Sequence, residues 1–272
     1  MTDTSPPPPP PELPAPPIRP LGELVHALRF LTRIPVPLAR TVDPPPLHQT
    51  MRMFSLAGAL IGLFTGGVLW ATAQLSVPSL LGCAIAVAAT ILMTGALHED
   101  GLADFADGIG GGKTREHRLE IMRDSRIGAY GALALMIAVL IRIFAYESLL
   151  SQEWPVLLAT IAASHSYSRG LIVDLMWATP PARSDGLSAS AGRPSRAVAI
   201  FAIVIGLLIT MATGALAAPE AAVVAMGLGL AAIAVIRRVA MKQLGGQTGD
   251  VLGAAQVSCE LAMLVSFAAT LG

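Results

Sequence analysis

The amino-acid sequence predicts an all-α protein, a polytopic bundle of transmembrane helices with about seven spans and six as the alternative. Hydrophobic residues make up 54% of the chain and charged residues 13%, whereas an ordinary soluble domain is roughly 25% charged. The apolar stretches are continuous and do not alternate with period two, which favours helices over a transmembrane β-barrel. Basic residues gather mostly in alternate loops, as expected of a chain that crosses a bilayer repeatedly.

The N-terminal region is expected to lie outside the bundle. Residues 1–20 contain ten of the 21 prolines, which predicts a disordered, proline-rich tail and not a signal peptide. In residues 21–34, leucine and valine recur at helical spacing, which predicts an amphipathic helix lying on the membrane surface. Residues 21–272 are therefore expected to form a single membrane-embedded domain.

The expected spans follow the uninterrupted apolar stretches. Residues 53–97 contain no Asp, Glu, Lys or Arg, and they are long enough for two spans of about 20 residues each. A turn near Pro78 would divide them. Prolines, glycines and charge clusters bound the remaining spans, which are expected at about 128–149, 155–178, 197–217, 219–236 and 251–271.

The distribution of basic residues predicts the orientation. Five precede the first span, five lie between spans two and three, three between spans four and five, and three between spans six and seven. Because cytoplasmic loops carry the excess of Lys and Arg, the N-terminus and these loops are expected in the cytoplasm. The lipid bilayer is the expected partner. Nucleic acid is not implied, because acidic and basic residues gather on the same side.

Some charged residues fall inside predicted spans, where a charge is costly and tends to face protein or water. Arg142 and Arg169 either pair with Glu147, Asp174 or backbone carbonyls, or have a functional role, and the sequence leaves both interpretations open. Glu260 lies within the last span and is a functional candidate for the same reason.

The acidic segment after the second span is the first place where chemistry is indicated. On a helix, Asp100, Asp104 and Asp107 share a stripe roughly 60° wide. Clustered carboxylates suit Mg²⁺ or Mn²⁺, and magnesium is usually bound by few carboxylates together with phosphate oxygens and water. We therefore predict a magnesium site on these three residues, with Glu99 or His98 as the catalytic base. The competing interpretation is a charged segment that is merely solvated.

Residues 99–127 are expected to form a cytoplasmic catalytic loop. Arginine can hold phosphate oxygens in a bidentate fork, although the positive-inside rule already explains part of this basic content. The candidates for binding phosphate or substrate are Lys113, Arg123, Asp124, Arg126 and, from a second glycine-rich loop, Asp250. Metal carboxylates together with arginines at a membrane surface indicate phosphoryl transfer. The spacing does not identify the substrate.

Four motifs in order resemble one known family. They are Phe-Leu-Thr-Arg-Ile-Pro-Val-Pro at 30–37, the acidic segment from 95 to 108, Asp-Ser-Arg-Ile-Gly-Ala-Tyr-Gly at 124–131 and Gly-Gly-Gln-Thr-Gly-Asp at 245–250. Together they resemble the cobalamin synthases, adenosylcobinamide-GDP ribazoletransferases of late vitamin B12 assembly. The resemblance covers essentially everything after the proline-rich tail.

The resemblance implies a multi-pass enzyme of the bacterial inner membrane with its active site facing the cytoplasm. It would join adenosylcobinamide-GDP to α-ribazole or its 5′-phosphate, forming adenosylcobalamin or its 5′-phosphate and releasing GMP, with Mg²⁺ required. Residues 179–187 are also similar to a loop of the family. Because Pro181 stands where the family more often has tyrosine, Arg183 carries less weight. The oligomeric state is left open, homo-oligomers included.

Two other functions are alternatives. A CDP-alcohol phosphotransferase also has an Asp-Gly pair on a membrane helix, but the arginine usual shortly after it is absent following Asp100-Gly101. A secondary transporter would use the intramembrane charges as a path across the bilayer. Against a transporter, the acidic residues gather at one boundary and no inverted repeat is evident.

Overall fold

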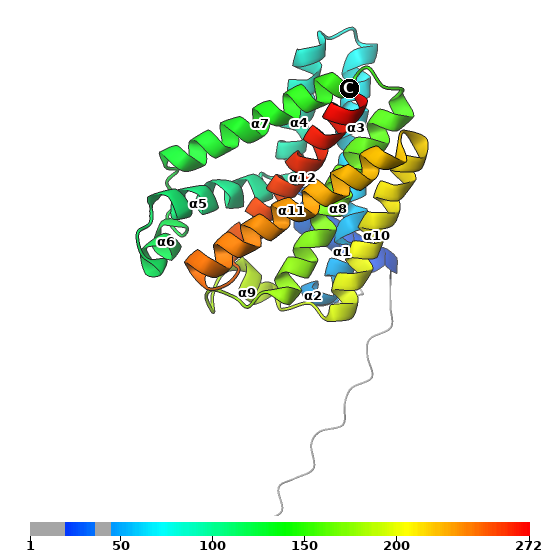
Figure 1. The fold of residues 1–272 in the computed structure, drawn as a ribbon. Coiled ribbons are helices and arrows are strands. Elements are labelled where there is room, and N and C mark those ends of the chain that lie inside the picture. The colour runs from blue at the N-terminus through cyan, green and yellow to red at the C-terminus, as the bar shows by residue number, and fades with distance from the viewer. Residues whose placement is uncertain (1–19, 36–44) are drawn as a thin grey trace, which may run out of the picture.

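The computed structural model describes residues 20–35 and 45–272, and within them the chain is helical, with one isolated bridge between Pro181 and Gln247. The elements are α1 (Pro20–Leu31), α2 (Leu47–Thr50), the 3-10 turn η1 (Met51–Met53), α3 (Phe54–Gln74), α4 (Ser79–Thr94), α5 (Leu97–Gly111), α6 (Arg115–Ile121), α7 (Ala129–Leu149), α8 (Trp154–Ala178), α9 (Leu187–Ala191), α10 (Arg196–Leu216), α11 (Pro219–Leu244) and α12 (Gly249–Leu271) (Figure 1). The all-α prediction is confirmed. Apart from Pro20, the proline-rich tail lies outside the described residues.

The number of spans agrees with the prediction. Among the described residues, six helical segments are long and apolar enough to cross a membrane: Leu47–Gln74, α7, α8, α10, α11 and α12. The expected second span is α4, which has only 16 residues. It continues into α5 through a bend of 91°, and this bent pair raises the count to seven if it is one span. Gly95 and Ala96, both with positive φ, form the bend.

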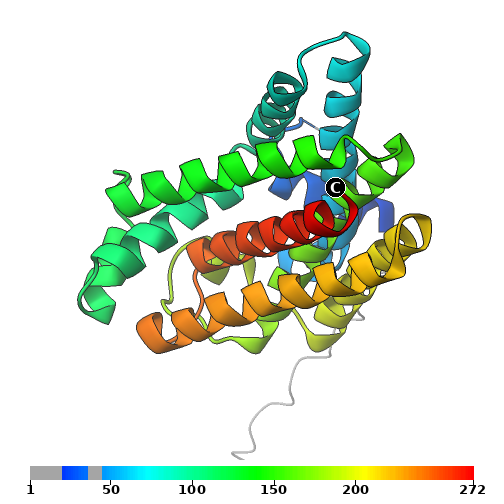
Figure 2. The same ribbon diagram turned by 45° about the horizontal axis from the view of Figure 1, so that its top comes forward.

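Helix α8 occupies the centre of the bundle and packs against α3, α10 and α12 (Figures 1 and 2). In its most apolar stretch 83% of the residues are buried inside the protein, against 28% for α7 and for α11. These outer helices expose large apolar side chains such as Leu140, Phe144 and Leu228. Such exposure is costly in water but suits contact with lipid.

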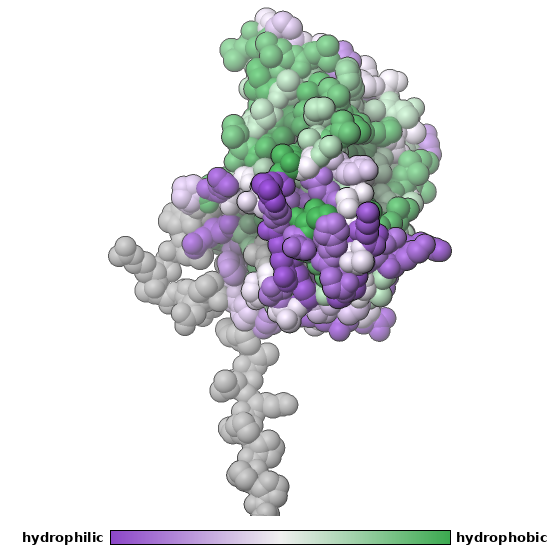
Figure 3. All heavy atoms as spheres, turned by 90° about the vertical axis from the view of Figure 1, so that its left-hand side faces the viewer, coloured by the Kyte–Doolittle hydropathy of each residue, from purple (hydrophilic) through white to green (hydrophobic). Residues whose placement is uncertain are grey.

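Polar and apolar surfaces are separated along the molecule. Seen from the side of α5 and α6, apolar side chains cover the upper part and polar ones the lower part (Figure 3). The polar end carries α6, α9 and the loop between α11 and α12 (Figure 1). This separation matches the predicted one-sided distribution of charge, and the cytoplasmic orientation of that end stays a prediction.

Loops distant in sequence meet at the polar end. Pro180 O accepts from the backbone N–H of Gln247, and Gln247 O accepts from that of Ala182, both at 2.8 Å. Arg115, at the start of α6, donates to the carbonyl oxygens of Leu244 and Ala182. The segment predicted as a catalytic loop, 99–127, is thus largely helical, consisting mainly of α5 and α6, and it is tied to both other loops. The sequence did not predict which loops converge.

Candidate active site

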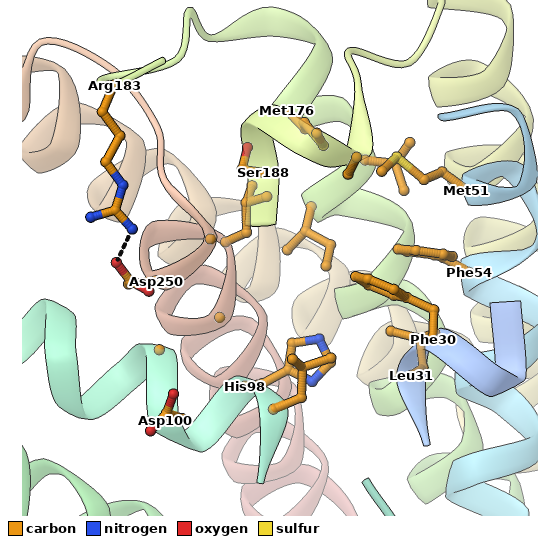
Figure 4. A pocket seen from close by; sticks show the side chains of 18 residues that line it. Phe30, Leu31, Met51, Phe54, His98, Asp100, Met176, Arg183, Ser188 and Asp250 are labelled. Atoms are coloured by element: carbon orange, nitrogen blue, oxygen red, sulfur yellow. Dashed lines mark ion pairs between the residues drawn. The ribbon is translucent and has the colours of Figure 1, made fainter. Parts of the chain in front are cut away.

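A pocket of about 220 Å³ opens between α1, α5, α8, α9 and the start of α12 (Figure 4). Its two halves differ in chemistry. Asp100, Arg183 and Asp250 form a polar half on one side of the view, and Phe30 and Phe54 lie on the other side. The further lining residues are Leu31, Met51, Leu97, His98, Gly101, Ile172, Val173, Met176, Ser188, Ala191, Gly249, Leu252 and Gly253.

Two facing glycines bring the carboxylates of the polar half together. A Cβ atom added to Gly101 on α5 would lie 3.0 Å from the Asp250 Cα and 3.2 Å from the Gly253 Cα. One added to Gly253 would lie 2.9 Å from the His98 carbonyl oxygen. Only residues without a side chain permit so close a crossing of α5 and α12. Asp100 therefore lies at the same pocket wall as Asp250, although they are far apart in sequence.

The polar half concentrates negative charge. The Asp104 carboxylate, which is beside the pocket but not among its lining residues, is close enough to Asp100, Asp250 and Asp107 to be repelled by each, and Arg183 is the cation that offsets this repulsion. Arg183 Nη2 lies 3.5 Å from Asp250 Oδ2. A further cation would relieve the repulsion among these carboxylates, because like charges repel unless they are neutralised.

The donor set fits magnesium in part. The oxygen ligands are of the kind that Mg²⁺ prefers. Within 20–35 and 45–272, however, no three acidic, histidine or cysteine side chains converge closely enough to form a complete site. A magnesium ion would therefore be held by Asp100, Asp104 and Asp250 at most one or two at a time, with phosphate oxygens and water as the other ligands, which is its usual mode.

Asp107 has a different environment from its neighbours. Its Oδ2 accepts from the backbone N–H of Gly128 at 2.7 Å and its Oδ1 from that of Gly131 at 2.9 Å. Both oxygens thus accept hydrogen bonds from backbone amides at the start of α7, where a negative charge also interacts favourably with the helix dipole. Asp107 is 7% exposed and is not among the pocket residues. Its role as a metal ligand stays a prediction, and this placement favours a structural one.

Glu99 points into the bundle and not into the pocket. Its Oε1 lies 2.9 Å from Arg142 Nη1, and Arg142 Nε donates to Glu260 Oε1 at 2.8 Å. All three side chains are at most 10% exposed. Because Arg142 holds Glu99, this placement favours a structural role, and Glu99 as the general base stays a prediction. His98, by contrast, lines the pocket between its two halves.

The charged residues inside the predicted spans form one buried network of ion pairs. Glu260 Oε2 accepts from Gln256 at 2.8 Å, lies 3.3 Å from His165 Nδ1 and lies 3.8 Å from Arg169 Nη1. Two arginines thus face two glutamates, and opposite charges compensate at a depth where single charges are costly. The prediction of Glu147 and Asp174 as partners was wrong, because the acids are Glu99 and Glu260. The predicted pairing with backbone carbonyls is confirmed for Arg169, whose Nη1 donates to the His165 carbonyl oxygen at 3.1 Å. This supports the structural alternative.

Four of the five predicted phosphate or substrate ligands lie outside the pocket lining, at the surface. Arg123 Nη2 donates to both carboxylate oxygens of Asp185, each at 2.8 Å, and Lys113 is exposed. Asp124 accepts from Arg126, whose side chain lowers the pKa of that carboxyl to about 2. Of the five candidates the structure brings only Asp250 into the pocket.

Arg183 is a pocket residue that was predicted with too little weight. Its side chain is 15% exposed, and its Nη1 is buried without a hydrogen-bond partner. The bridge between Pro181 and Gln247 holds its loop against the start of α12. The signal was present in the family-like loop at 179–187, but only the pairing of the two loops shows that Arg183 reaches Asp250.

Comparison with known proteins identifies the family of this chain. The family model described as cobalamin-5-phosphate synthase matches residues 23–268. The adenosylcobinamide-GDP ribazoletransferase of Azorhizobium caulinodans is 43% identical over 90% of this chain and 94% of its own. That of Bradyrhizobium diazoefficiens is 42% identical over 92% of this chain and 94% of its own. No solved structure matches. The chain belongs to the cobalamin-5-phosphate synthase family and is a transferase of cobalamin biosynthesis.

Proposed function

We propose that the protein joins adenosylcobinamide-GDP to α-ribazole or its 5′-phosphate in a magnesium-dependent reaction at this pocket. The products are adenosylcobalamin or its 5′-phosphate and GMP. The observation that carries the proposal is the meeting of Asp100, Asp250 and Arg183 at one pocket wall. Family membership favours this transferase over the CDP-alcohol phosphotransferase and transporter alternatives.

In the proposed reaction, a ribazole hydroxyl oxygen forms a bond to the phosphorus next to cobinamide. The bond from that phosphorus to the oxygen bridging the diphosphate breaks, and GMP leaves with that oxygen. Magnesium bound by Asp100, Asp104 and Asp250 would polarise the phosphoryl oxygens. The partly buried guanidinium of Arg183 would stabilise the developing negative charge, and its unpartnered Nη1 is free to donate a hydrogen bond.

His98 is the pocket side chain best placed to take the proton. It lies between the polar and apolar halves and is 5% exposed. An imidazole nitrogen can accept the proton of the attacking hydroxyl as the new bond forms. The buried charges of Arg142, Arg169 and Glu260 act electrostatically on His98.

We further propose that the polar end faces the cytoplasm of a bacterial inner membrane. This end carries the segment between α5 and α7, the segment between α8 and α10, and the end of α11 (Figure 1). All three contain basic residues. Cytoplasmic loops carry such an excess of positive charge. This orientation gives the pocket direct access to soluble nucleotides.

The test uses purified protein in lipid, supplied with adenosylcobinamide-GDP and α-ribazole 5′-phosphate, while GMP and the corrinoid product are followed by chromatography. We expect both products to form with Mg²⁺, to disappear with EDTA and to return when Mg²⁺ is added back. Asp100→Asn should abolish them. Glu116→Gln, which changes an exposed acid on α6, is the matched control and should keep wild-type activity. Absence of both products with folded protein would refute the proposed reaction.

A further inference from the structure

We infer that the apolar half of the pocket is the subsite for the heteroaromatic base of the acceptor nucleoside, and that the corrinoid donor stays outside the pocket. The inference rests on the proposed function and goes beyond it, because it assigns the two substrates to different places. Three observations carry it: the volume of the pocket, the composition of its apolar wall and the position of its polar half.

The volume decides between the two substrates. The pocket holds about 220 Å³, which is below the roughly 300–1,000 Å³ of sites that enclose a drug-sized ligand. A planar base with its sugar is of that small size. A corrin macrocycle with its side chains and nucleotide is several times larger. Only the diphosphate of the donor can reach the polar half, and the macrocycle must lie beyond Asp100 and Arg183.

The apolar wall has the chemistry that a planar heteroaromatic ring requires. Phe30 and Phe54 stack with ring centroids 5.7 Å apart and planes inclined by 16°. Met51 and Met176 lie beside them in the same wall (Figure 4). Aromatic faces and polarisable thioethers both interact favourably with π-systems. Ile172 and Val173 are further lining residues, and their side chains are also apolar.

The order of groups along the pocket matches an acceptor nucleoside. A base between Phe54 and Met176 would place the attached sugar beside His98, which lies between the halves. The sugar hydroxyl would then point toward Asp100 and Arg183, where the donor phosphoryl group has to lie. Helix α1 supplies Phe30, and it is held by the ion pair of Glu23 with Arg52. The wall is therefore built jointly by α1, α3 and α8.

The test fills the apolar half and measures the two substrates separately. Full-length protein in lipid is assayed with α-ribazole varied at saturating adenosylcobinamide-GDP, and then with the donor varied at saturating acceptor. For Met176→Phe we expect the KM for α-ribazole to rise at least tenfold while the KM for the donor stays within twofold. Met211→Phe is the matched control, because Met211 is 47% exposed on the outer face of α10, and it should change neither value.

Two more variants separate pocket filling from misfolding. Met176→Leu conserves the volume and should restore the acceptor KM to near the wild-type value. Met176→Ala enlarges the pocket and should raise kcat/KM for ribazoles with bulkier bases relative to that for α-ribazole. A rise in the donor KM equal to that of the acceptor, or an acceptor KM unchanged in Met176→Phe, would overturn the subsite assignment.

Equilibrium dialysis with radiolabelled α-ribazole makes the test independent of turnover. Binding to the wild type that is lost in Met176→Phe and kept in Met211→Phe supports the subsite, even if no GMP forms and the proposed reaction fails. Ribose 5-phosphate, which lacks the base, should bind at least tenfold more weakly than α-ribazole 5′-phosphate. Equal binding of these two probes would overturn the inference while leaving the reaction intact.

Discussion

At the residue scale, the position of Asp250 depends on its neighbours more than on its own helix. Thr248 caps α12, accepting from the backbone N–H of Val251 and donating to Asp250 Oδ2. The bridge of the neighbouring loops brings Arg183 to within 3.5 Å of the same carboxylate oxygen. Asp250 is thereby oriented into the pocket toward Asp100 on α5. The loop before α12 and the first turn of that helix belong to the site because the segment at Pro180–Ala182 holds them there.

This arrangement predicts that Asp250→Asn weakens metal use. The amide keeps the size and the hydrogen bond to Thr248 but removes one negative charge from the cluster. We expect the Mg²⁺ concentration for half-maximal rate to rise about 10- to 100-fold, the range seen when a group supporting a metal site is lost. A Mg²⁺ titration of the initial rate measures it, with Glu116→Gln as the unaffected control. An unchanged Mg²⁺ requirement would exclude Asp250 from the metal site.

The buried network makes a second residue-scale prediction. Arg142→Met leaves Glu99 and Glu260 without their closest cation, and removing one partner of a buried pair costs roughly 3–5 kcal/mol. We expect the free energy of unfolding, measured by titration with SDS in mixed micelles, to fall by that amount.

The double variant Arg142→Met/Glu260→Met is the control for uncompensated charge. It keeps the network neutral, since Arg169 and Glu99 remain. Its loss of stability should therefore be smaller than the sum of the two single losses, by about 0.5–3 kcal/mol. Strict additivity would show that the charges at this depth act independently, contrary to the network described above.

At the element scale, the contact between α3 and α8 depends on small residues that let the two backbones approach. A Cβ atom added to Gly62 would lie 2.6 Å from the Ala162 Cα and 2.9 Å from the Ile161 carbonyl oxygen. Gly67, on the same helix, has no atom within 4 Å of such a Cβ. Helices in membranes often associate through such small residues, because apolar side chains gain little by leaving lipid.

This pair of glycines gives a matched comparison. Gly62→Ala should separate α3 from α8 and destabilise the protein by about 1–3 kcal/mol, the usual cost of overpacking. Gly67→Ala makes the same chemical change without the contact and should be neutral or stabilising by up to about 1 kcal/mol, since alanine favours the helix. Thermal unfolding in detergent distinguishes them. Equal effects would show that the helix contact does not depend on backbone approach.

At the scale of the whole molecule, the separation of polar and apolar surface predicts one orientation. The two cysteines of the described chain, Cys83 and Cys259, are buried and free, so a membrane-impermeant thiol reagent should react little with the wild type. Lys113→Cys, on the exposed polar end, should be labelled only in inside-out membrane vesicles. Ser151→Cys, between α7 and α8, should be labelled only in right-side-out vesicles. The reverse pattern would overturn the proposed cytoplasmic site.

Much of the fold was predictable because its signals are local. Continuous apolar stretches bounded by prolines and glycines predict α7, α8, α10, α11 and α12 to within a few residues at most boundaries, and the long extension of α11 past residue 236 is the main exception. The extension carries the basic residues that end the apolar stretch, which hydropathy assigns to a loop. The 91° bend after α4 depends on two consecutive left-handed residues, which hydropathy does not detect.

The site was predicted less completely, because a spacing rule cannot distinguish carboxylates with different surroundings. Asp100, Asp104 and Asp107 share a helical face, yet Asp107 accepts two amide hydrogens from the start of α7 while Asp100 lines the pocket. Similarly, Arg123 reaches Asp185, whereas Arg183 reaches Asp250. Both distinctions arise from contacts between segments far apart in the chain.

The sequence by itself determined the helical membrane class, the segregation of charge to one end, the family and the acidic segment around Asp100. These follow from the composition, the hydrophobic periodicity and the motifs, which are local signals that extend over one helical turn or one span. Tertiary structure alone decided that Asp250 and Arg183 join Asp100, that Glu99 pairs with Arg142, and that an apolar wall adjoins the carboxylates. The physical reason is that pairing, burial and pocket shape are properties of helices packed together, and residues distant along the chain meet only once the bundle has closed.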